Sequence, residues 1–118
     1  MRTVPIVRTL PYLNVLDTDN LGQLVDVGDV VDTGTFDIPL NDNSCYLLTV
    51  RVINGNQTNR LNAIVNTGSS GGFITVLESN NLSVAMKGST SDVTVTNSTG
   101  STRNLGYTLI CLFDPQFT

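Results

Sequence analysis

The chain has 118 residues, a length that fits one domain with a hydrophobic core of its own. Charged residues make up 14% of the sequence and the net charge is −4, without a cluster of lysine and arginine residues. This composition excludes the basic footprint of a nucleic-acid-binding protein and the basic face of a membrane-binding helix, and no apolar run is long enough for a transmembrane helix. We therefore expect neither a nucleic acid partner nor membrane insertion.

The N-terminal segment differs from the rest of the chain, because β-like patterning begins only at Leu24. Pro5 and Arg8 stand where a signal peptide would carry its apolar stretch, so no secretion signal is expected. Residues 1–23 are interpreted as an N-terminal extension and residues 24–118 as one folded domain.

From Leu24 onward, short apolar runs alternate with clusters of Gly, Asn, Asp and Ser, a pattern typical of strands and turns. Helical periodicity is almost absent. Seven to eight short strands in succession predict an all-β fold, an antiparallel β-sandwich that is jelly-roll-like. The predicted strands span residues 24–31, 35–40, 46–53, 61–65, 73–77, 82–86, 93–96 and 107–113.

Four patterns predict where individual strands lie. Residues 46–53 and 107–113 are nearly all apolar, which indicates central strands covered on both faces. Residues 93–96 alternate between valine and threonine, as a strand with one solvated face does. Pro39 cannot donate to a ladder, so residues 35–40 are expected at a sheet edge. Asn54 and Gly55 predict a hairpin with a tight turn.

The sequence contains no histidine, which excludes Ser-His-Asp triads, Cys-His nucleophiles and imidazole zinc sites. Cys45 and Cys111 are interpreted as two buried thiols in strands, with a disulfide between them as the open alternative. Residues 17–22 begin like a calcium loop, but Leu21 and Gly28 stand where oxygen ligands belong. We expect no metal and no cofactor.

One segment resembles a catalytic loop. Residues 30–35, with Asp32, Thr33 and Gly34, resemble the active-site loop of retroviral-type aspartic proteases, in which two subunits each supply one aspartate. The second supporting element of that family consists of two apolar residues followed by glycine. It is incomplete here, because only Asn104-Leu105-Gly106 stands in its place. The favoured interpretation is an acidic residue in a turn bent by Gly34, and we expect no enzymatic activity.

A larger resemblance extends from Gly34 to Phe113. An edge strand leads through polar residues 41–44 into the apolar residues 45–52, and residues 93–100 precede a last strand close to the end of the chain. This stretch resembles the C-terminal head (tip) domains of phage tail fibres and related tailspikes. The resemblance implies a homotrimeric β-sandwich at the tip of a fibre on the virion, which attaches to a bacterial surface receptor, glycan or protein. Residues 1–23 would then be the stump of a shaft or a collar.

Within this resemblance, recognition is expected in loops at the distal end of the head, in residues 54–60, 67–72 and 97–103. These loops hold no aromatic platform for a sugar, so hydrogen bonding would have to come from polar side chains. A structural virion protein, such as a capsid decoration or tail accessory subunit, is an alternative with the same fold. The candidate receptor-binding residues are Asn54, Asn56, Gln57, Asn59, Arg60, Ser69, Ser70 and Arg103.

Overall fold

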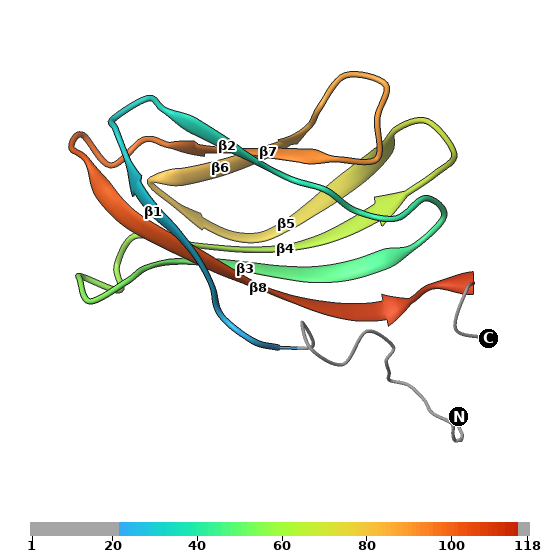
Figure 1. Cartoon of the computed structure of the whole chain (residues 1–118), viewed down its shortest axis with the longest axis horizontal. Helices are drawn as coiled ribbons and strands as arrows, with labels where there is room; N and C mark the ends of the chain where they lie inside the picture. Colours follow the sequence, from blue (N-terminus) through green and yellow to red (C-terminus); the bar gives the residue numbers. More distant parts are fainter. Residues whose placement is uncertain (1–21, 116–118) are drawn as a thin grey trace.

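The computed structural model describes residues 22–115, which form eight strands in two antiparallel sheets packed face to face (Figure 1). The predicted all-β antiparallel sandwich is therefore confirmed. The predicted N-terminal extension lies outside the described residues, apart from its last two. The strands are β1 (Val25–Val30), β2 (Thr35–Ile38), β3 (Cys45–Val52), β4 (Arg60–Thr67), β5 (Gly72–Asn80), β6 (Leu82–Met86), β7 (Val93–Asn97) and β8 (Arg103–Phe113).

The larger sheet has the strand order β1-β8-β3-β4-β5, and the smaller sheet has the order β2-β7-β6. The first strand pairs with the last and the second with the seventh, as in a jelly roll. β3, β4 and β5 form a meander of consecutive hairpins within the larger sheet. Within residues 22–115, no helix is long and apolar enough to span a membrane.

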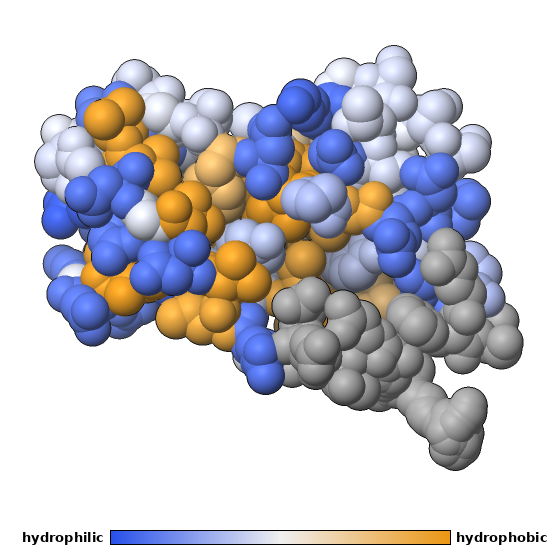
Figure 2. Space-filling model, in the orientation of Figure 1, coloured by the Kyte–Doolittle hydropathy of each residue, from blue (hydrophilic) through white to orange (hydrophobic). Residues whose placement is uncertain are grey.

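The core lies between the two sheets because every second side chain of a strand points inward. β3 and β4 alternate strictly between buried and half-buried positions, and β7 alternates in the same way. Phe36 of the smaller sheet stacks on Tyr107 of the larger one with ring centroids 6.1 Å apart. Hydrophobic residues reach the surface in patches across the middle of the side seen in Figure 2. The buried core consists of Val30, Ile38, Leu48, Val50, Val52, Leu61, Val65, Leu82, Val93, Val95 and Leu105.

Two of the strand predictions are confirmed. β2 is an edge strand of the smaller sheet, and Pro39 follows it directly. Thr94 and Thr96 of β7 are half-buried and alternate with the fully buried Val93, Val95 and Asn97, so this strand has one partly solvated face.

The expectation that residues 46–53 and 107–113 are covered on both faces is wrong. No layer of described residues covers the outer face of the larger sheet, so the outward side chains of β3, such as that of Leu47, stay half-buried. In β8, Ile110, Leu112 and Phe113 are exposed. A run of apolar residues therefore indicates a central strand correctly, but here it does not indicate a second covering layer.

The predicted hairpin at Asn54 and Gly55 exists between β3 and β4, but it is not a tight turn. Seven residues, 53–59, connect the two strands. Asn54 takes the expected left-handed conformation with a φ of 56°, whereas Gly55 has no positive φ. The loop is thus longer than the dipeptide indicates, and this length exposes its polar side chains.

Candidate functional site

The connections between strands gather at the two ends of the sandwich (Figure 1). The β1–β2, β3–β4, β5–β6 and β7–β8 connections lie at one end, which we call the arginine end after Arg51, Arg60 and Arg103. The β2–β3, β4–β5 and β6–β7 connections lie at the other end, which we call the phenylalanine end after the exposed Phe73 and Phe113.

The expectation that the three candidate loops share one distal end is wrong. Residues 54–60 and 97–103 lie at the arginine end, whereas residues 67–72, with Ser69 and Ser70, lie at the phenylalanine end. Successive hairpins of an antiparallel meander turn at opposite ends, so the β3–β4 and β4–β5 loops cannot meet. Of the predicted site residues, the structure brings together Asn54, Asn56, Gln57, Asn59, Arg60 and Arg103.

The β3–β4 loop is held in one shape by its own side chains. The Gln57 amide donates to the carbonyl oxygens of Val52 at 2.8 Å and Gly55 at 3.2 Å. The Asn56 side-chain oxygen accepts a hydrogen bond from the Thr58 backbone N–H at 2.8 Å. These bonds restrain the loop before any ligand binds, which lowers the entropy lost on binding.

Asn59 does not fit the role that the sequence predicts for it. The residue is buried, and its side-chain oxygen accepts a hydrogen bond at 2.8 Å from the side-chain amide of Asn81 in the β5–β6 turn. Asn59 therefore holds the β3–β4 loop against that turn rather than offering a polar group to a receptor.

The β7–β8 loop is anchored by the fully buried Asn97, a residue that the sequence analysis did not single out. Its amide nitrogen donates to the carbonyl oxygens of Val30, Val31 and Ser101 at 2.8, 3.2 and 3.0 Å. Its side-chain oxygen accepts from the Thr99 backbone N–H at 2.9 Å. One side chain thus fixes the β7–β8 loop to the end of β1.

Asp32 lies in the exposed β1–β2 turn, as the interpretation of an acid in a turn predicts. Its carboxylate accepts a hydrogen bond at 3.0 Å from the backbone N–H of Gly100 in the β7–β8 loop. Thr33 has a φ of 64°, and a Cβ at Gly34 would lie 2.9 Å from atoms of Val31. The Asp-Thr-Gly triplet therefore builds the turn and ties it to the neighbouring loop.

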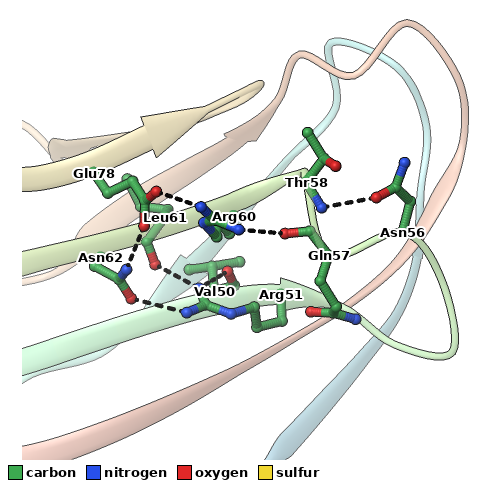
Figure 3. Close-up of polar contacts among 9 residues, drawn as sticks. All are labelled: Val50, Arg51, Asn56, Gln57, Thr58, Arg60, Leu61, Asn62 and Glu78. Atoms are coloured by element: carbon green, nitrogen blue, oxygen red, sulfur yellow. Dashed lines mark hydrogen bonds and ion pairs between the residues drawn. The ribbon is translucent and has the colours of Figure 1, made fainter.

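A polar ladder crosses the outer face of the larger sheet beside these loops (Figure 3). Arg51 of β3 pairs directly with Arg60 of β4 in the sheet register. Arg51 donates to the side-chain oxygen of Asn62 at 3.2 Å, and the Asn62 amide donates to Glu78 of β5 at 3.0 Å. Arg60 forms an ion pair with Glu78 at 2.7 Å and donates to the Gln57 carbonyl oxygen at 3.2 Å. The ladder thus connects three strands to the β3–β4 loop.

The charges of the ladder act on one another. The hydrogen bond from Arg60 holds the pKa of Glu78 below its usual range, and partial desolvation opposes this shift. The same contact raises the pKa of Arg60. Arg51 also lowers the pKa of Glu78 through its charge. Glu78 and Arg60 are therefore both charged at neutral pH, and the guanidinium of Arg51 adds a second positive charge beside them.

Arg51, Asn62 and Glu78 were missed as candidate site residues. Because the residues around Arg51 are mostly apolar, the strand was expected to be buried on both faces. The alternation of its inward and outward positions was therefore not recognised. The available signal was the polar residue at every second position, Thr49 and Arg51 in β3 and Arg60 and Asn62 in β4.

The half of the same outer face toward the phenylalanine end is apolar. In the sheet register, Leu47 of β3 lies between Ile110 of β8 and Ile64 of β4. The next row is formed by Phe113, Cys45, Asn66 and Phe73. Phe73 is 66% exposed and Phe113 53%, so this half of the face presents large apolar side chains to solvent.

The β4–β5 loop with Ser69 and Ser70 belongs to the phenylalanine end and is tied to its neighbours there. The Gly68 carbonyl oxygen accepts hydrogen bonds from the Asn43 backbone N–H at 3.1 Å and from the Ser91 hydroxyl at 3.2 Å. These contacts join the β2–β3, β4–β5 and β6–β7 connections into one cluster.

Both cysteines are free thiols in neighbouring strands, so no disulfide joins them, but they are half-buried rather than buried as expected. Burial raises the pKa of Cys111 to about 11, with a further contribution from the nearby Asp114. Burial also raises the pKa of Cys45. Among residues 22–115, no three Cys, Asp or Glu side chains are placed to hold a metal ion together.

Comparison of the chain with protein-family models, with curated proteins and with solved structures finds no match.

Proposed function

We propose that this chain is the receptor-binding head of a phage tail fibre, which attaches the virion to a bacterial surface receptor. The arginine end binds the receptor, and the phenylalanine end holds three copies of the head together. The observation that carries this proposal is the contrast on one sheet face, where pre-shaped polar loops at one end oppose exposed apolar side chains at the other.

The direction of the chain supports the assignment of the arginine end to the receptor. β1 enters the larger sheet from the phenylalanine end, because the Gly22 N–H donates to the Leu109 carbonyl oxygen at 3.1 Å and Val30 pairs with Arg103. A head that follows a fibre shaft therefore turns its arginine end outward. This is the end where the β3–β4 and β7–β8 loops project.

The apolar half of the outer face supports assembly. Contiguous apolar patches larger than a few hundred Å² are unusual on monomeric proteins and mark interaction surfaces. Phe73, Ile110, Leu112 and Phe113 are all exposed at this end. A homotrimer buries them without covering the loops at the opposite end.

The proposal is tested by incubating the labelled full chain with envelopes from a panel of bacteria and measuring the bound fraction. We expect saturable binding to some envelopes, because surface receptors differ between strains. Arg103→Met, at the arginine end, should weaken this binding several-fold. Lys87→Met removes one cation from the β6–β7 side of the phenylalanine end and should leave binding unchanged.

Other outcomes identify the alternatives. Binding only to assembled phage particles would overturn the proposal in favour of a decoration or tail accessory protein. Peptide cleavage by a dimer, lost in Asp32→Asn, would overturn it in favour of an aspartic protease.

A further inference from the structure

We propose that Arg51 and Arg60 bind an anionic group, a carboxylate or a phosphate, carried by an acidic glycan. This inference rests on the proposed function and specifies the chemical class of the receptor. The two arginines stand directly opposite each other on neighbouring strands. Like charges in such cross-strand positions repel each other. Two cations are therefore held at a place where an anion would relieve their repulsion.

The described residues compensate only part of this charge. Glu78 is the one carboxylate in contact with the pair, and its ion pair is with Arg60. Among residues 22–115, Arg51 donates only to neutral oxygens, the carbonyls of Val50 at 3.0 Å and Leu61 at 3.3 Å and the amide oxygen of Asn62 at 3.2 Å. The Arg51 guanidinium is thus oriented by three acceptors but not neutralised by them.

A second carboxylate on this face, that of Asp26, is separated from Arg51 by one strand. Asp26 belongs to β1 and pairs with Gly106 of β8, which in turn pairs with Arg51. Two strand spacings, roughly 10 Å, separate the backbones of Asp26 and Arg51, and Arg51 extends its guanidinium toward β4 on the opposite side. At physiological ionic strength, charges at such a separation on an exposed surface are largely screened.

The surroundings of the pair fit the acidic group of a sugar. The side chains of Arg60 and Glu78 are 38% and 36% exposed, so a ligand can reach them. The space where Gly106 would carry a Cβ is filled by the ends of Ile53 and Leu24, and Leu24 is 57% exposed. A guanidinium binds carboxylate and phosphate through two parallel hydrogen bonds, and the apolar wall beside it can contact the C–H groups of the ring.

The site is tested with three soluble probes in an NMR titration of the full chain at low ionic strength. Glucuronate carries a carboxylate, glucose 6-phosphate carries a phosphate, and glucose is the neutral control. We expect a saturable shift of the Arg51 and Arg60 guanidinium signals with at least one acidic probe, which also identifies the anion. No shift with either acid, or an equal shift with glucose, would overturn the inference.

Variants of the ladder give effects of opposite sign. Arg51→Met and Arg60→Met should each weaken the binding of the acidic probe by about tenfold, since each removes a charge-assisted hydrogen bond. Glu78→Gln should tighten it several-fold, because it removes the carboxylate that competes with the ligand. This gain is measurable even if an arginine variant fails to fold.

The matched control is Lys87→Met. Lys87 is also a surface cation with one acidic partner, Asp37, at 2.6 Å, but it extends from the smaller sheet at the opposite end. Its removal should leave probe binding unchanged. An equal loss in Lys87→Met would show that only the net charge matters and would contradict a site at Arg51 and Arg60.

The inference and the proposed function fail in different ways. If Arg51→Met and Arg60→Met bind bacterial envelopes as tightly as the natural chain, the inference is wrong and the function stands. If the acidic probe binds at the arginine pair but no envelope is bound, the site is real and the proposed function is wrong.

Discussion

Along the outer face of the larger sheet, β3 and β4 place Leu47 and Ile64 toward the phenylalanine end, and Arg51 and Asn62 toward the arginine end. The inward positions of the same strands are buried from one end to the other, and all of them except Thr67 at the end of β4 are hydrophobic. The inward positions therefore specify the fold, and the outward positions are free to differ. The two ends of one sheet can in this way carry two unrelated surfaces, one for assembly and one for a ligand.

The largest expected effect is on assembly. Phe73→Lys places a charge at the most exposed aromatic side chain of the phenylalanine end, where an interface would have to desolvate it. We expect the trimer to dissociate at concentrations where the natural chain is assembled, with an association constant lowered at least about 100-fold. Sedimentation velocity over a concentration series measures this change.

The control for this substitution is Val31→Lys. Val31 is 63% exposed, almost as much as Phe73, but it lies in the β1–β2 turn at the arginine end. The mass of this variant should equal that of the natural chain. Dissociation of both variants to the same extent would mean that the interface between copies is not confined to the phenylalanine end.

The next largest effect concerns the stability of the arginine end. Asn97→Ala removes a fully buried side chain that satisfies three carbonyl oxygens and one backbone N–H. Leaving such groups buried without partners should lower the free energy of unfolding by about 2–3 kcal/mol. Urea unfolding measures the loss, and Asn54→Gly, at an exposed position with a φ of 56°, should change the stability far less.

A smaller effect separates the two cysteines. Cys45 lies in the apolar row between Phe113 and Asn66, so assembly should shield it. With iodoacetamide at pH 8, we expect Cys45 to react several-fold faster in Phe73→Lys than in the natural chain. Cys111, with a pKa of about 11, should react slowly in both, because about one thousandth of it is thiolate at that pH.

Mass spectrometry of the labelled peptides distinguishes the two thiols. Equal labelling of Cys45 in the two proteins would show that the apolar half of the sheet is not covered in the assembled state.

The smallest effect is electrostatic. The pKa of Glu78 is lowered mainly by its hydrogen bond from Arg60, so Arg60→Met should raise it toward its usual range. A lowered carboxyl pKa contributes stability that is present at neutral pH and lost as the pH falls through that pKa. Because both side chains are exposed, this contribution is small. Carboxyl-detected NMR titration measures the shift, and Asp37, whose pKa is lowered mainly by Lys87 at the other end, should not move.

Much of the fold follows from the sequence because strand patterning is local. Alternating valine and threonine in residues 93–96 and the apolar run in residues 46–53 specify strands without reference to their partners. The start of β8 at Arg103 was not predicted, since it depends on pairing with Val30 more than seventy residues earlier. Which faces of β3 and β8 stay uncovered depends likewise on the whole arrangement of sheets.

The candidate site was predictable only in part, for the same reason. Loop composition pointed to Gln57, Arg60 and Arg103, which do lie at one end. It could not show that Asn59 is buried against Asn81, because that contact forms between loops far apart in sequence. Nor could it place Ser69 and Ser70 at the opposite end without the order of the strands.

The central claim is that the phenylalanine end serves assembly and the arginine end serves receptor binding. It is tested most directly by the binding isotherm of the double variant Phe73→Lys/Arg103→Met on a bacterial envelope that the natural chain recognises. Phe73→Lys alone should lose avidity, by about 100-fold or more, while keeping a residual single-site binding. We expect Arg103→Met to weaken that residual binding by the same factor as in the trimer. Residual binding that is unchanged by Arg103→Met, in a variant confirmed to be monomeric, would contradict it.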